Sequence, residues 1–178
     1  MKRVAQAVVM TRLAHQLHEK GSWCGETHLQ KSVYLLQELE NVPLEFEFIL
    51  YKHGPFSFDL RDRLTELRAE GYLDLVPKPY PYGPTLAPSD QAKKTWKGFP
   101  ITLGKYKNHL ARVSELVADK GVTELEQIAT ALYVTKELGK VSKTKRAKRM
   151  VELKPHVSEE DAENAIDTID AAIKAGKQ

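Results

Sequence analysis

The sequence predicts a mainly α-helical chain with a small β-hairpin, in which a winged-helix-like N-terminal unit is followed by a C-terminal helical bundle. Apolar residues recur at helical spacing through most of the chain. Alternation of period two is confined to short segments near residues 45–51 and 72–76. A loop rich in proline and tyrosine follows the second of these, and a short extended segment at 85–87 comes after it.

Composition and length indicate a folded chain of one domain, or of one domain with a helical extension. The 178 residues are 42% hydrophobic and 29% charged, which supplies a core and argues against disorder. Gly98-Phe99-Pro100 is the best candidate boundary, so we place a winged-helix-like domain at 1–98 and a helical region packed on it at 99–178.

Charge and cysteine content predict the compartment. The net charge of +3 permits nucleic-acid binding but is also common in ordinary cytosolic proteins. The one cysteine, Cys24, cannot form an internal disulfide and fits a reducing compartment. Polar residues interrupt the apolar ones near the N-terminus, so we expect neither a signal peptide nor a membrane span, and a cytoplasmic protein.

Two helices and a strand are expected in the first fifty residues. The first helix covers about 4–20, before Gly21. The second begins at Thr27, where Thr27 and Gln30 match a capping box, and it ends near Pro43. The alternating residues 45–51 predict a strand.

The segment from Ser57 to Ala87 is the most informative. Ser57 caps a helix that runs to Glu70, and Leu60, Leu64 and Leu67 form its buried stripe. The strand, loop and strand that follow give the order of a recognition helix and its wing. Tyr80 and Tyr82 of the loop either contact a partner or pack back on the domain, and the sequence favours neither.

The remaining chain is predicted to be helical. Helices are expected from Ser89 to Trp96, over about 105–120, from a capping box at Thr123, from Ser142 to Leu153, and after Ser158.

Opposite charges gather in the last two of these helices. Residues 140–154 hold seven basic side chains and one acidic one, whereas residues 158–170 hold six acidic side chains and no basic one. The basic run is either a phosphate-binding surface or a face neutralised by the acidic helix, and the near cancellation slightly favours neutralisation.

The helix after Ser57 has the same ambiguity. Arg61, Arg63 and Arg68 are expected to point outward, where a winged helix reads a groove. Four acids share this outer surface and would weaken phosphate binding: Asp59, Asp62, Glu66 and Glu70. Such mixed charge suits a protein-facing surface better.

Catalytic and metal-binding signatures are sparse. No glycine-rich phosphate loop, GxSxG or HExxH pattern is present. His15 and His18 lie one helical turn apart near Cys24, but a zinc site normally needs four ligands. His53, beside Gly54-Pro55, is interpreted as a turn residue, and an unfamiliar active site around His53, Tyr51 and Lys52 is a distant third hypothesis.

Three segments resemble a known family. The run Leu29-Gln30-Lys31-Ser32-Val33-Tyr34-Leu35-Leu36 and the run Phe48-Ile49-Leu50-Tyr51-Lys52-His53-Gly54-Pro55-Phe56-Ser57 resemble YwgA-like proteins and the broader SocA-like, or Panacea, antitoxin domain. The later Leu153-Lys154-Pro155-His156-Val157-Ser158-Glu159-Glu160 is similar to a segment of YwgA-like sequences. His53 stands where an aromatic or basic residue is usual. The resemblance implies a winged-helix-related fold without a known active site, and SocA-like members act as antitoxins or adaptors that bind proteins.

Two binding hypotheses follow. The first is a non-enzymatic, antitoxin-like or adaptor-like protein that holds a protein partner through Tyr80, Tyr82, Arg61, Arg68 and His53. The alternative is a regulator of double-stranded DNA, with these candidate contacts: Arg61, Arg63, Arg68, Lys143, Lys145, Arg146, Lys148 and Arg149. Neither hypothesis includes a catalytic residue, a metal or a cofactor, and the oligomeric state is left open.

Overall fold

The prediction of a mainly α chain with a small β component is confirmed. The computed structural model describes residues 1–79 and 83–176. The elements in this part of the chain are α1 (Arg3–Glu19), α2 (Glu26–Glu38), β1 (Ile49–Tyr51), β2 (Gly54–Phe56), α3 (Phe58–Ala69), β3 (Leu73–Val76), β4 (Thr85–Pro88), α4 (Asp90–Trp96), α5 (Pro100–Val117), α6 (Val122–Leu138), α7 (Lys143–Leu153) and α8 (Glu159–Ala175).

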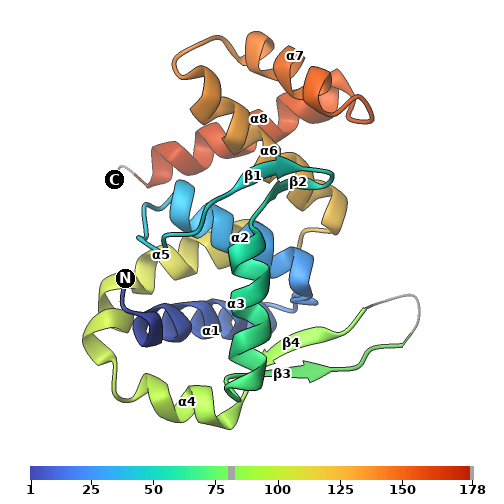
Figure 1. The fold of residues 1–178 in the computed structure, drawn as a ribbon. Coiled ribbons are helices and arrows are strands. Elements are labelled where there is room, and N and C mark those ends of the chain that lie inside the picture. Colours follow the sequence, from blue (N-terminus) through green and yellow to red (C-terminus); the bar gives the residue numbers. More distant parts are fainter. Residues whose placement is uncertain (80–82, 177–178) are drawn as a thin grey trace.

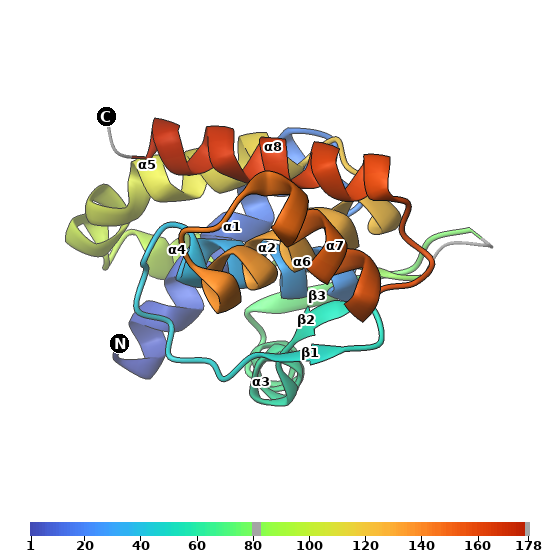
Figure 2. The same ribbon diagram turned by 90° about the horizontal axis from the view of Figure 1, so that it is seen from above.

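Helix α2 lies at the centre of the molecule. It packs against α5 and α6, and the nine residues 28–36 are all buried. Helices α6, α7 and α8 form a layer at one end, whereas α1, α4 and α5 lie towards the other (Figure 1). Figure 2 shows α3 on the side of the molecule opposite α8. A helix buried on all sides must find internal partners for its polar groups, and this requirement shapes the site described below.

The strands form two separate antiparallel hairpins. In the first, Ile49 pairs with Phe56 and Tyr51 with Gly54, so Lys52 and His53 make the turn. In the second, Leu73 pairs with Pro88 and Val76 with Thr85. The β3–β4 hairpin follows α3 directly and projects from the body of the molecule (Figure 1). The predicted order of helix, strand, loop and strand is therefore present.

Serine side chains cap four of the helices, and the caps predicted at Ser57, Ser89 and Ser158 are confirmed. The hydroxyl groups of Ser57, Ser89, Ser142 and Ser158 each accept a hydrogen bond from a backbone N–H in the first turn of the following helix. These caps depend only on residues three positions apart, which makes them readable from the sequence.

The capping boxes predicted at Thr27 and Thr123 are wrong. Helix α2 begins at Glu26, because the amide of Gln30 bonds to a distant backbone instead of to its own helix start. Helix α6 begins at Val122, and Glu124 accepts a hydrogen bond from the Gly121 N–H at 3.0 Å.

Two segment boundaries also differ from expectation. The strand predicted over 45–51 is restricted to 49–51, because the side-chain amide of Gln37 makes both backbone hydrogen bonds of Phe46 and replaces a strand partner. Helix α5 starts at Pro100 rather than near residue 105, since proline at the first helical position needs no N–H partner.

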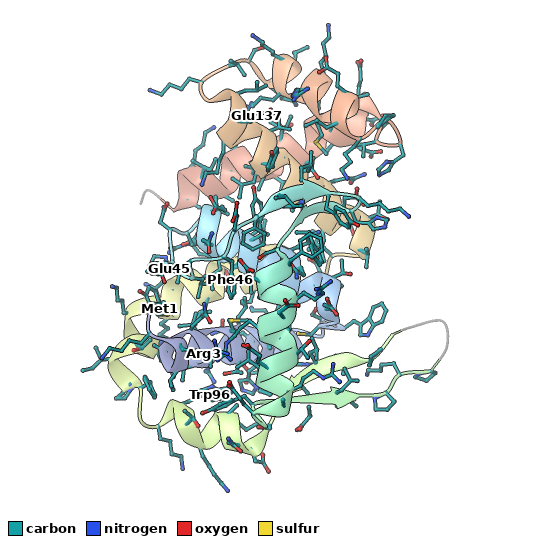
Figure 3. All side chains as sticks on the ribbon, viewed as in Figure 1. Met1, Arg3, Glu45, Phe46, Trp96 and Glu137 are labelled. Atoms are coloured by element: carbon teal, nitrogen blue, oxygen red, sulfur yellow. The ribbon has the colours of Figure 1, made fainter. Side chains whose placement is uncertain are left out.

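One hydrophobic core joins both parts of the chain. A single cluster of buried residues runs from Ala7 in α1 to Ile169 in α8, so residues 1–98 and 99–178 share it. Beside it, Trp96 points from α4 towards α1, where its indole N–H donates to Thr11 Oγ1 at 2.9 Å (Figure 3). Among the described helices, none combines the length and apolar character needed to cross a bilayer.

Candidate partner-binding site

An exposed aromatic patch covers the β1–β2 hairpin and the start of α3. We define it as Ile49, Tyr51, Phe56 and Phe58. Ile49 is 43% exposed, Tyr51 is 53% exposed and Phe58 is 43% exposed. Phe56 is half-buried, and the rings of Tyr51, Phe56 and Phe58 lie 5.1–5.8 Å apart in pairs, tilted or edge-on to one another.

The outer face of α3 continues this patch. Phe58, Arg61, Thr65 and Arg68 recur every three or four residues, which places them on one stripe. The guanidinium group of Arg61 lies 5.2 Å from the centre of the Phe58 ring and pairs with Asp62. Arg68 is exposed and forms no ion pair with the described residues.

A cleft of about 330 Å³ opens beside this stripe, between α3, the start of α2 and the β3–β4 hairpin. Its walls include Trp23, whose indole N–H donates to the Gly83 carbonyl oxygen at 3.0 Å. Apolar side chains of Leu64, Leu75, Leu86 and Val122 line it, and Arg61 and Arg68 stand on its α3 side. The stripe therefore has aromatic rings at one end and an apolar cleft along its length.

Buried polar groups of α2 hold the β1–β2 hairpin in place. The Gln30 amide N–H donates to the Ser57 carbonyl oxygen at 2.9 Å, and the Ser57 N–H donates to Gln30 Oε1 at 3.1 Å. The Lys31 ammonium donates to the Pro55 carbonyl oxygen at 2.8 Å, although Lys31 is only 2% exposed. Burial lowers the pKa of Lys31 to about 8, against the opposing effect of Glu126.

A second buried lysine, from the C-terminal part of the chain, bonds to the same hairpin. Lys154 donates to the carbonyl oxygens of Tyr51, at 2.7 Å, and of Lys52. Its ammonium lies 3.3 Å from Glu126 Oε1, and both side chains are less than 10% exposed. We call Lys31, Glu126 and Lys154 the buried charge cluster. It fixes the backbone that carries the aromatic patch.

Two histidines cover this cluster from outside. His53 Nδ1 and His156 Nε2 each lie 3.4 Å from a carboxylate oxygen of Glu126. Both imidazole rings are more than half exposed. Among the described residues, no group of histidine, cysteine, aspartate and glutamate side chains has the arrangement of a metal site. The ammonium of Lys154 also stands where a cation would have to bind.

No protein-family model matches the chain, and no curated protein matches it either.

The three segments quoted in the sequence, 29–36, 48–57 and 153–160, meet at one place. Gln30 and Lys31 belong to the first segment, the hairpin with Pro55 and Ser57 to the second, and Lys154 to the third. Sequence analysis missed this convergence, because the lysines are 123 positions apart and a single lysine is usually solvated. The available signal was that Lys31 is the one charged side chain between Thr27 and Gln37 of this helix.

The three arginines predicted to point outward from α3 differ in their exposure. Arg61 and Arg68 are exposed, as expected. The expectation that Arg63 points outward is wrong, because its side chain is 5% exposed and bonds to Glu66 at 3.1 Å and to Glu70 at 3.0 Å. Two acids predicted to oppose phosphate therefore neutralise Arg63 instead.

The predicted basic cluster on α7 is largely occupied by internal ion pairs. Arg146 is buried and makes two 2.7 Å hydrogen bonds to Asp170, which lower the pKa of that carboxyl group. Lys143 bonds to Asp167 at 2.6 Å, and Arg149 bonds to Glu137 at 3.0 Å (Glu137 is labelled in Figure 3). Lys145 and Lys148 are exposed. Four partners of these bases are Asp167, Asp170 and Glu163 of α8 and Glu137 of α6.

The remaining predicted contacts are Tyr80, Tyr82 and His53. Tyr80 and Tyr82 lie outside the described residues. His53 lies in the β1–β2 turn next to Tyr51 of the aromatic patch. It is therefore close to the site that the structure outlines.

The lowered pKa of Lys31 predicts a specific dependence of stability on pH. Between about pH 8 and the unfolded value of 10.5, the folded protein loses the Lys31 proton while the unfolded chain keeps it. Stability should therefore rise through this range, by on the order of 2 kcal/mol for this one group. The free energy of unfolding, measured with urea at pH 7.5 and at pH 10, should rise less between these two pH values for Lys31→Met than for the native protein. Exposed Lys94→Met is the control and should rise like the native protein, whereas equal rises in all three proteins would contradict the assignment.

Proposed function

We propose that this protein is a non-enzymatic, winged-helix-like binding protein of the antitoxin-like or adaptor-like kind, which acts by holding a protein partner. The observation that carries the proposal is the exposed aromatic patch of Ile49, Tyr51, Phe56 and Phe58 beside Arg61. Aromatic residues and arginine are the side chains most enriched where proteins bind one another tightly.

The rigidity of the patch supports this proposal. Side-chain bonds from Gln30, Lys31 and Lys154 hold the hairpin backbone from two directions. A surface fixed before binding loses little conformational entropy when a partner arrives. Burying charged side chains costs free energy. Charged groups buried beneath an exposed hairpin therefore favour a function in which the hairpin must keep one conformation.

The alternative proposal is a regulator of double-stranded DNA. The order of α3 followed by the β3–β4 hairpin favours it, as do exposed Arg61 and Arg68. Against it, Arg63 and Arg146 are buried in ion pairs. Helix α7 also lies away from α3 in both views, so exposed Lys145 and Lys148 do not extend the α3 surface (Figures 1 and 2).

Comparison of matched surface variants tests the proposal. Tyr51→Ser combined with Phe58→Ser should reduce co-purification of the partner from the native host by about tenfold or more, with a stability loss below about 1 kcal/mol. The control replaces two exposed apolar residues elsewhere, Val4 (47% exposed) and Ile101 (86% exposed), with serine. It should retain the partner.

The same proteins separate the two proposals. Duplex DNA binding at low salt that falls steeply as salt rises would favour the DNA alternative. Equal partner recovery with the patch variant and with the control would reject the aromatic patch as the contact surface.

A further inference from the structure

The cleft beside α3 has an apolar floor and a partly exposed aliphatic rim. Leu64 and Leu86 are buried at its floor, whereas Leu75 is 43% exposed and Val122 is 40% exposed on its sides. Partly exposed aliphatic side chains around a hollow suit an apolar anchor from a ligand.

Two arginines border this apolar hollow. Arg61 and Arg68 are seven residues apart on α3, which places them two turns and about 10 Å apart along the helix axis. Thr65 lies between them on the same face. Asp62 pairs with Arg61 at the surface, and the exposed carboxylate of Glu26 stands across the cleft at the start of α2. On the α3 side, Arg68 therefore carries a positive charge that no described carboxylate pairs, whereas Arg61 shares its charge with Asp62.

We propose that the cleft binds an extended, acidic segment of a protein partner, with one apolar side chain in the cleft and a carboxylate towards each arginine. This inference rests on the proposed protein-binding function. A volume of about 330 Å³ takes one large side chain and its backbone, but not a helix about 10 Å across. In an extended segment, residues i, i+2 and i+4 share one face, and the outer two are about 13 Å apart. That span is within reach of two long arginine side chains, so the expected pattern is acid, any residue, apolar, any residue, acid.

The apolar lining distinguishes this ligand from a nucleic-acid backbone. Phosphates would be attracted by Arg61 and Arg68, but they have no group to fill the space among Leu75, Leu86 and Val122.

Fluorescence anisotropy with labelled synthetic peptides tests this inference. Three peptides are compared. The first has glutamate, serine, leucine, serine and glutamate in that order. The second has lysine in place of both glutamates, and the third has serine in place of leucine. The first should bind at least about tenfold more tightly than either counterpart. Arg61→Glu combined with Arg68→Glu should reverse the preference in favour of the lysine peptide. The control, Lys94→Glu on α4 with Lys97→Glu directly after it, makes the same change in net charge and should keep the native preference.

Equal binding of the acidic and lysine peptides, or an acidic preference that survives the arginine substitutions, would overturn the inference. Steep salt-dependent binding of duplex DNA through Arg61 and Arg68 would also overturn it. The proposed function is tested by a different experiment. If partner recovery does not depend on Tyr51 and Phe58, the proposed contact surface is rejected, but the peptide-binding result is unaffected.

Discussion

Replacing Glu126 with glutamine is expected to lower the free energy of unfolding by about 3–5 kcal/mol at pH 7, because removing one member of a buried ion pair leaves an uncompensated charge. Glu126 is the acid of the buried charge cluster, and it lies 3.3 Å from Lys154. Glutamine keeps the shape of the side chain, so the loss reports charge rather than packing. Urea unfolding followed by circular dichroism measures it.

Two further measurements identify the cause of this loss. Raising the pH to 10 should recover part of the stability of Glu126→Gln, because Lys31, whose pKa is already near 8, then becomes neutral. Glu115→Gln, at a side chain that is 64% exposed and paired with Lys20, should cost less than about 0.5 kcal/mol. A loss below 1 kcal/mol for Glu126→Gln would show that the cluster does not hold the hairpin.

Gly54→Ala should lower the free energy of unfolding by about 1–3 kcal/mol, because it forces a side chain into a left-handed backbone conformation. Gly54, the first residue of β2, has φ of +80°. An added Cβ would lie 3.1 Å from Thr130 Oγ1 and 3.4 Å from the Glu126 carbonyl oxygen. Thermal unfolding of the variant measures the loss.

Three controls separate backbone strain from contact and from histidine chemistry. In a Thr130→Ala background the Gly54→Ala loss should persist if the positive φ is its main cause. Gly104→Ala in α5 meets open space and should stabilise the helix by up to about 1 kcal/mol. His53→Ala removes a ring that is 63% exposed and should cost little. A His53→Ala loss equal to that of Gly54→Ala would contradict this account of the turn.

Local signals explain what could be predicted from the sequence. The caps at Ser57, Ser89 and Ser158, the buried stripe of α3 and the β3–β4 hairpin depend on residues that are close together in the chain. The opposite charges of 140–154 and 158–170 slightly favour neutralisation of α7 by α8, and Asp167 and Asp170 make those contacts.

Side chains that bond to residues outside their own helix or strand explain what could not be predicted from the sequence. Gln30 fits a capping box as well as it fits its actual contact with Ser57, and only the tertiary structure decides between them. Gln37 likewise replaces the strand partner of Phe46. The aromatic patch depends on a hairpin register that exposes Tyr51, and the pattern of 45–51 does not specify that register.

The central claim is that the aromatic patch contacts a protein. Photocrosslinking in the native host tests it most directly, with p-benzoylphenylalanine placed at Tyr51 in one protein and at Ile101 in another. Both positions are exposed, at 53% and 86%, but only Tyr51 belongs to the patch. We predict one discrete protein adduct from position 51 and none from position 101. Nucleic-acid adducts from position 51, or the same adducts from both positions, would contradict the claim.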